Sequence, residues 1–144
     1  GCLSGITDYY ETLSDHHFGE NNLDLHRKGK KVFELVSKHE EVLMKELIDF
    51  LKTKKNIRMI GKQTHARCDR MPTVSFTVKD KSSLHVAQEA GRNNIGIRNG
   101  EFYAWRCLKG LGIEPNDGVV RVSMVHYNSI EEVRKLIGFL DKTI

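Results

Sequence analysis

Residues 93–140 have the sequence NNIGIRNGEFYAWRCLKGLGIEPNDGVVRVSMVHYNSIEEVRKLIGFL, and they contain the clearest structural signals in the chain. Alternating apolar residues predict a strand over Val119 to Met124. The turn signal Asn116-Asp117-Gly118 comes directly before this strand. A helix should then begin at Ser129, because Glu132 completes a capping box with it. A strand that leads through a short turn into an amphipathic helix indicates a compact domain with a sheet and packed helices.

The helical and strand periodicities of the apolar residues predict the remaining elements. We expect helices and strands at these places: a helix over 1–14, a polar loop over 14–24, a long amphipathic helix over 25–53, strands at 57–60 and 72–78, a helix from Ser82 or Ser83 to Ala90, a strand at 95–98 and a helix over 101–111. Strands that follow one another without a helix between them favour a mainly antiparallel or mixed sheet. The predicted class is α+β with two layers, in which helices cover one face of the sheet and a long helix lies near the N-terminus.

Composition limits the kind of protein. A chain of 144 residues, 39% hydrophobic and 29% charged, fits one soluble domain. Without an apolar run long enough to span a bilayer, we expect no membrane partner. The net charge of +4 is a mild excess, and the basic cluster over residues 52–58 is interpreted as a solvated helix end. Nucleic-acid binding is not expected, because aromatic and basic residues do not interleave and no recognition motif is present.

Cysteines and histidines give no metal site. Cys2, Cys68 and Cys107 lack the short spacing of zinc ligands or of a redox pair, which favours free thiols in a reducing, cytoplasmic compartment. His16 and His17 are adjacent in the expected polar loop, and neighbouring loop residues rarely hold a metal without further ligands. We therefore expect no metal.

Arg121 is the residue that most needs explaining. It shares one face of its predicted strand with Ser123, opposite the apolar face. The rigid fork of an arginine suits a carboxylate or a phosphate. The alternative is an ordinary arginine that faces solvent or pairs with a local acid, and the pattern alone favours that alternative. Arg98 ends another predicted strand just before Gly100, so both arginines could point at one anion site. Asn128 precedes the helix cap, where ordinary capping is the simpler interpretation.

Several of these pieces together resemble a known family. Arg98-Asn99-Gly100, Gly118 to Ser123 and Tyr127 to Glu132 look like the C-terminal part of the class V aminotransferases. That family includes the cysteine desulfurases and selenocysteine lyases, which are pyridoxal phosphate (PLP) enzymes of fold-type I. Arg70 to Phe76 and Gly100 to Ala104 are similar to the cysteine desulfurase-like branch. The resemblance implies that residues 25–144 form the small C-terminal domain, and that 1–24 form an interdomain helix and loop.

The resemblance also implies roles for individual residues. Arg121 matches the arginine that binds the α-carboxylate of the amino-acid substrate. Arg98 matches the arginine that leads the loop at the border of the active site, and Tyr103, His126 and Asn128 lie at the same border. In the desulfurases the position of Tyr103 holds the nucleophilic cysteine. Because a tyrosine cannot accept a persulfide, and Cys107 lies one helical turn further on, the usual persulfide route is not expected.

The implied cofactor is PLP, held in the full-length parent by a large domain of the same chain. The family's cofactor lysine, aspartate and phosphate loop have no match here, so this fragment alone is expected to bind no cofactor, to hold no catalytic residue and to be inert. The resemblance implies a homodimer in the parent. The alternative function is a non-catalytic, partner-binding module that retains the fold, and an exposed apolar stripe on the 25–53 helix would favour it.

Overall fold

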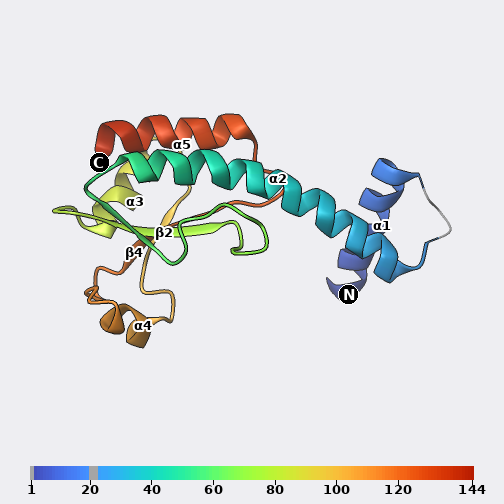
Figure 1. Cartoon of the computed structure of the whole chain (residues 1–144), viewed down its shortest axis with the longest axis horizontal. Helices are drawn as coiled ribbons and strands as arrows, with labels where there is room; N and C mark the ends of the chain where they lie inside the picture. Colours follow the sequence, from blue (N-terminus) through green and yellow to red (C-terminus); the bar gives the residue numbers. More distant parts are fainter. Residues whose placement is uncertain (1, 20–22) are drawn as a thin grey trace. The chain divides into compact units, whose positions relative to one another are not determined.

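The computed structural model describes residues 2–19 and 23–144 (Figure 1). In chain order the elements are α1 (Cys2–Phe18), α2 (Leu25–Thr53), β1 (Ile57–Ile60), β2 (Thr73–Val78), α3 (Ser83–Arg92), β3 (Arg98–Gly100), α4 (Trp105–Gly110), β4 (Val119–Ser123) and α5 (Ile130–Thr143). The contacts divide the chain into two compact units, Gly1–His39 and Glu40–Ile144. The candidate residues named above all belong to the second unit.

The second unit contains a four-stranded sheet in the order β1-β2-β4-β3. Every neighbouring pair is antiparallel, which confirms the predicted α+β class. Side chains alternate between the two faces of a strand, so Val74, Phe76 and Val78 point to one face of β2 and are buried there. The alternation that predicted this strand is therefore the alternation that builds the core.

One face of the sheet is covered by helices. The C-terminal half of α2 lies beside α5 on the same side of the sheet (Figure 1). Residues from this half of α2, from α3 and from α5 join the sheet in one buried cluster; its fully buried members include Leu43, Leu47, Phe76, Val86, Val120 and Leu140. Each such side chain stabilises the fold by about 1.5–3 kcal/mol through its removal from water.

The opposite face is covered only in part. A second, smaller cluster forms there from Leu108 on α4, Ile113 and Val119, with Ile60 and Phe102 packed against it. Arg121 and Ser123 follow Val119 on this same face of β4. The helical layer thus leaves a polar strip of the sheet accessible beside α4, and the strip contains the candidate site.

The predicted strand at 95–98 is wrong. Residues 95–97 are not in the sheet, and β3 comprises Arg98–Gly100. Asn94 adopts a left-handed backbone with φ of 56°. The N–H of Ile95 then donates to the carbonyl of Ala90 at 2.9 Å, the pattern of a Schellman helix end. Ile95 and Ile97 pack on the core from this helix end. Their alternation therefore resembles that of a strand, although they pair with no other strand.

Two helix boundaries also differ from expectation. The helix predicted over 101–111 begins only at Trp105, because a tight turn uses the residues before it. The first helix continues past residue 14 to Phe18, so His16 and His17 are helical and not in a loop. Gly19, with φ of 63°, ends that helix. Inside the first unit, Lys28 on α2 forms an ion pair of 2.8 Å with Asp15 on α1.

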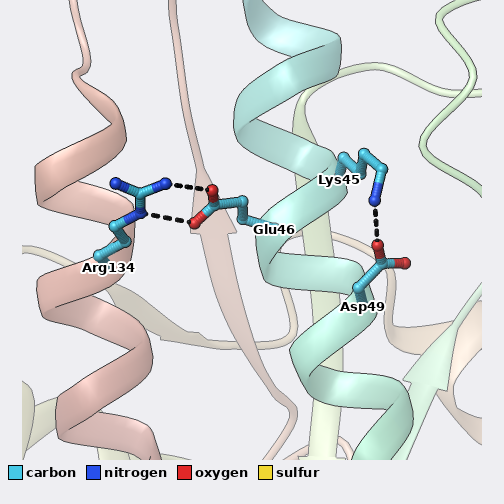
Figure 2. A network of polar contacts seen from close by, with 4 residues as sticks. All are labelled: Lys45, Glu46, Asp49 and Arg134. Atoms are coloured by element: carbon cyan, nitrogen blue, oxygen red, sulfur yellow. Dashed lines mark hydrogen bonds and ion pairs between the residues drawn. The ribbon is translucent and has the colours of Figure 1, made fainter.

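An ion pair joins α2 to α5 in the second unit (Figure 2). The Nε and Nη2 atoms of Arg134 donate to the two carboxylate oxygens of Glu46 at 3.0 and 2.7 Å. This hydrogen bonding holds the pKa of Glu46 below its ordinary value. Figure 2 also shows Lys45 and Asp49, which form a 2.6 Å pair within α2 alone.

Glu46→Gln is expected to lower the melting temperature at neutral pH. Since folding depresses the pKa of Glu46 below its ordinary 4.5, the pair contributes fully above pH 4.5 and loses its effect as the pH falls through the folded value. The difference from wild type should therefore shrink in melting curves recorded at successively lower pH. Asp49→Asn is the matched control, with a smaller expected loss, because its pair joins no second element. A difference for Glu46→Gln that persists unchanged at about pH 2 would contradict this account.

Candidate functional site

The two arginines lie on the accessible face of the sheet. Arg121 on β4 is in register with Ser75 on β2 and with Arg98 on β3. Directly opposite residues of antiparallel strands point to the same face, so these three side chains form one row across the sheet. Arg121 is half-buried and Arg98 is exposed. The fold thus places as cross-strand neighbours two cations that are 23 positions apart in the sequence.

Arg121 has an aromatic neighbour and, within the described residues, no ion pair to an acid. Its guanidinium carbon lies 3.8 Å from the centre of the Phe102 ring, close enough for a cation–π stack. Among residues 2–19 and 23–144, no carboxylate forms an ion pair with Arg121. The structure therefore does not show Arg121 paired with a local acid, and its half-buried side chain lies on the partly accessible face of the strand.

Phe102 reaches Arg121 through a turn that the sequence did not reveal. The N–H of Ala104 donates to the carbonyl of Glu101 at 2.8 Å, and the two residues between have positive φ, 49° at Phe102 and 59° at Tyr103. This is a type I′ turn, which normally uses asparagine and glycine. Each left-handed non-glycine residue costs about 1–3 kcal/mol, and such strain concentrates at functional sites. Tyr103, a predicted border residue, is fully exposed at the tip of this turn.

Gly118 brings the two strands of the site together. A Cβ atom at this position would lie 2.2 Å from the carbonyl carbon and oxygen of Gly100, closer than any real contact. Gly118 also has φ of 71°, which favours glycine. Gly100 in turn has φ of 129°, a backbone conformation that favours glycine. The backbone approach of these two glycines fixes β3 against the start of β4.

Asn128 fixes the turn that precedes α5, whereas the helix cap itself is Ser129. Its Oδ1 accepts from the N–H of Val125 at 2.9 Å, and its Nδ2 donates to Glu132 at 3.0 Å. Ser129 and Glu132 form the predicted capping box. The hydrogen bond from Asn128, and then that from the Ser129 backbone, hold the pKa of Glu132 below its ordinary value. His126 is half-buried, and its ring stacks edge-on against Tyr127 at 5.4 Å.

Comparison with known proteins gives the family. The model of the family described as aminotransferase class-V matches residues 25–136. The chain therefore belongs to the class V aminotransferases, a PLP-dependent and typically dimeric family. An aminotransferase-like protein, FGM3 of Gibberella zeae, is 36% identical over 129 residues, which cover 89% of this chain and 30% of that relative. The cysteine desulfurase-like protein ustD of Aspergillus flavus is 35% identical over 115 residues, covering 76% of this chain and 26% of that relative.

A solved structure agrees with this assignment. The apo cysteine desulfurase from Thermococcus onnurineus NA1 superposes with a TM-score of 0.70 at 27% identity, covering 83% of this chain and 28% of that one. The predicted resemblance to the class V family is thus confirmed. The chain spans under a third of the length of the curated relatives it matches, 30% of the first and 26% of the second.

The residues around the cavity at the end of β4 do not by themselves fit the family's cofactor. PLP requires a lysine free to form a Schiff base and an acid for its ring nitrogen. A cavity beside the end of β4 is lined in part by Lys135, Glu132 and Asn94. Lys135 donates to the Asn94 carbonyl at 3.4 Å, and Glu132 accepts from the Ser129 backbone within the capping box. These side chains bind the ends of α3 and α5 and do not form a cofactor site.

The described ranges contain neither a metal-ligand cluster nor a helix that could span a membrane. No group of three or more histidine, cysteine or acidic side chains is placed to hold a metal ion in the part of the chain that the structure describes. Within the same ranges, no helix has both the length and the apolar character needed to cross a bilayer. Cys68 and Cys107 are free and exposed.

Proposed function

We propose that this chain is the substrate-carboxylate domain of a PLP-dependent, class V enzyme of cysteine desulfurase-like or aminotransferase-like type. Residues 25–144 would form its small C-terminal domain, and residues 1–24 the helix and loop that lead into it. A large domain of the same full-length chain would hold the cofactor. Arg121 would bind the α-carboxylate of the amino-acid substrate, with Arg98, Tyr103, His126 and Asn128 around it.

The observation that carries this proposal is that Arg121 is half-buried and forms no ion pair with any acid in the described part of the chain. Like charges directly opposite each other on neighbouring strands are destabilising, and Arg98 lies opposite Arg121. An anion bound at Arg121 would relieve that repulsion. A carboxylate held by two parallel N–H groups gains both energy and a fixed orientation. Orientation of the substrate is a large part of what an enzyme contributes.

Tyr103 limits which reaction the site supports. A cysteine at this position would attack the substrate sulfur, whereas the Tyr103 phenol cannot accept a sulfur atom. Cys107 lies on α4 beyond the turn, at a position that does not match. We therefore propose that the reaction takes place at the α-carbon of the substrate and forms no persulfide on Tyr103.

The test compares two ligands of the full-length protein loaded with PLP. L-Alanine has the α-carboxylate, and L-alaninamide differs from it in lacking that charge. We expect L-alanine to bind about 100-fold more tightly, as followed by the visible absorbance of the cofactor, because a charge-assisted bidentate contact is lost in the amide. Equal binding of the two ligands would reject carboxylate recognition as the function of this domain.

A second candidate function rests on exposed apolar residues of the first unit. Its large exposed apolar side chains are Leu3, Ile6, Tyr9, Phe18, Leu25 and Phe33. Exposed apolar surface marks a site of contact with another protein surface. We propose that it contacts the large domain or the second subunit of a homodimer in a cytoplasmic enzyme. If the full-length protein bound no PLP and still formed a complex through this surface, a non-catalytic, partner-binding module would be the better description.

A further inference from the structure

We propose that Phe102 is the positioning residue of the carboxylate site. Its ring would hold the Arg121 guanidinium in the one plane from which two N–H groups face the substrate carboxylate. This inference rests on the proposed function of Arg121 and adds to it the element that fixes the direction of binding. The resemblance to the class V family implies no role for Phe102.

The geometry of the stack sets the direction of the donors. At 3.8 Å from the ring centre, the guanidinium carbon is already in van der Waals contact with the ring face. An edge-on guanidinium would bring its nitrogens closer still, by up to about 1.3 Å, because that is the length of a C–N bond with partial double-bond character. Only a guanidinium roughly parallel to the ring avoids this clash. Its N–H groups then point sideways, in the plane where a carboxylate binds in two bonds.

The ring itself is held from two directions. Phe102 packs against the cluster of Leu108, Ile113 and Val119. Its backbone is fixed by the type I′ turn, in which it is the first left-handed residue. A flexible loop would release the strain of this conformation, so its persistence indicates that the surrounding contacts determine the position of the ring. Arg121 therefore stacks on a fixed surface.

The acid that begins this turn is not paired with Arg121. Glu101 directly precedes Phe102, yet it forms no ion pair with Arg121. Its Oε2 atom is buried and has no hydrogen-bond partner among the residues that the structure describes. A carboxylate that bound Arg121 from within the chain would occupy the donors that a substrate needs. The stack on Phe102 satisfies one face of the guanidinium and leaves its edge available.

Two substitutions of Phe102 separate stacking from packing. Phe102→Leu keeps an apolar side chain against the cluster and removes the π face, whereas Phe102→Tyr keeps both. In the full-length, PLP-loaded protein, Phe102→Leu is expected to weaken L-alanine binding about tenfold and to leave L-alaninamide unchanged. Phe102→Tyr should stay within about twofold of wild type for both ligands. Wild-type affinity for L-alanine in Phe102→Leu would overturn the proposal, as would an equal loss for both ligands, which indicates general damage to the fold.

A spectroscopic readout reports the stack without activity. A guanidinium above an aromatic ring experiences its ring current, so the side-chain N–H protons of Arg121 should resonate upfield of the other arginines in proton–nitrogen NMR spectra. The shift should disappear in Phe102→Leu and persist in Phe102→Tyr. An unshifted Arg121 in the wild-type protein would overturn the proposal even if Phe102→Leu folded poorly.

Arg121→Ala tests the carboxylate site itself, whereas Phe102→Leu tests the positioning role of Phe102. If Arg121→Ala left the preference for L-alanine over L-alaninamide intact, the carboxylate site itself would be wrong. If Arg121→Ala abolished that preference while Phe102→Leu preserved it, only the positioning role of Phe102 would be rejected.

Discussion

Arg121→Ala should weaken the binding of L-alanine to the full-length, PLP-loaded protein by about 100-fold and leave the binding of L-alaninamide almost unchanged. The loss corresponds to about 2.7 kcal/mol, the free energy expected for one charge-assisted, bidentate contact. Arg121→Lys should give an intermediate loss of about tenfold, because lysine keeps the charge and lacks the planar fork. Equilibrium titration followed by the cofactor absorbance measures both values.

Arg106→Ala is the matched control for this prediction. Arg106 is an exposed arginine on α4, so its removal changes the net charge by the same amount. L-Alanine binding should stay within about twofold of wild type, since exposed charges act weakly through water and salt. Equal losses for Arg121→Ala and Arg106→Ala would attribute the effect to overall charge, and would remove the specific role of Arg121.

Gly118→Ala should lower the free energy of unfolding by about 3 kcal/mol or more, the range of severe overpacking combined with backbone strain. The added Cβ would lie 2.2 Å from two backbone atoms of Gly100, and backbone cannot rotate away as a side chain can. Gly112→Ala provides the control, because Gly112 has φ of 69° against 71° for Gly118 and nothing lies within 4 Å of its added Cβ. That variant should lose about 1 kcal/mol from strain alone.

Urea unfolding of the three proteins separates the two causes. The difference between Gly118→Ala and Gly112→Ala isolates the close approach of the strands, since both substitutions place alanine at nearly the same φ. In Gly118→Ala we also expect β3 to move away from β4 and to carry Arg98 out of register with Arg121. Similar losses in the two variants would show that the approach of Gly100 contributes nothing to stability.

The fold was predictable where short periodic signals agree with long-range packing. The strand at 119–123 and the helix that follows Ser129 each have a local signature, and the structure keeps both. The bounds of α2 agree with the predicted 25–53, because its apolar residues recur at helical spacing over most of its length. The strand prediction at 95–98 was wrong because Ile95 and Ile97 alternate as in a strand, whereas Ile95 closes the end of α3.

The candidate site was predictable only in part. The two arginines could be placed on strands from period-two alternation, and their pairing required the sheet order. The sequence did not predict the turn at 101–104. Phe102 and Tyr103 occupy its two central positions, where a type I′ turn normally has asparagine and glycine. The contact between Phe102 and Arg121 joins segments 19 residues apart and depends on that turn, so local pattern could not predict it.

The order and lengths of the strands bear on how this protein associates with others. The outer strands, β1 and β3, have only four and three residues. Short edge strands offer few free backbone N–H and C=O groups. A strand from another chain therefore finds few partners for hydrogen bonds there. On one edge, Arg58 of β1 also directs its side chain to the Leu111 carbonyl at 2.8 Å. The short edge strands thus disfavour edge-to-edge aggregation of the sheet. We expect this protein to associate with other chains through side-chain surfaces and not through a shared sheet.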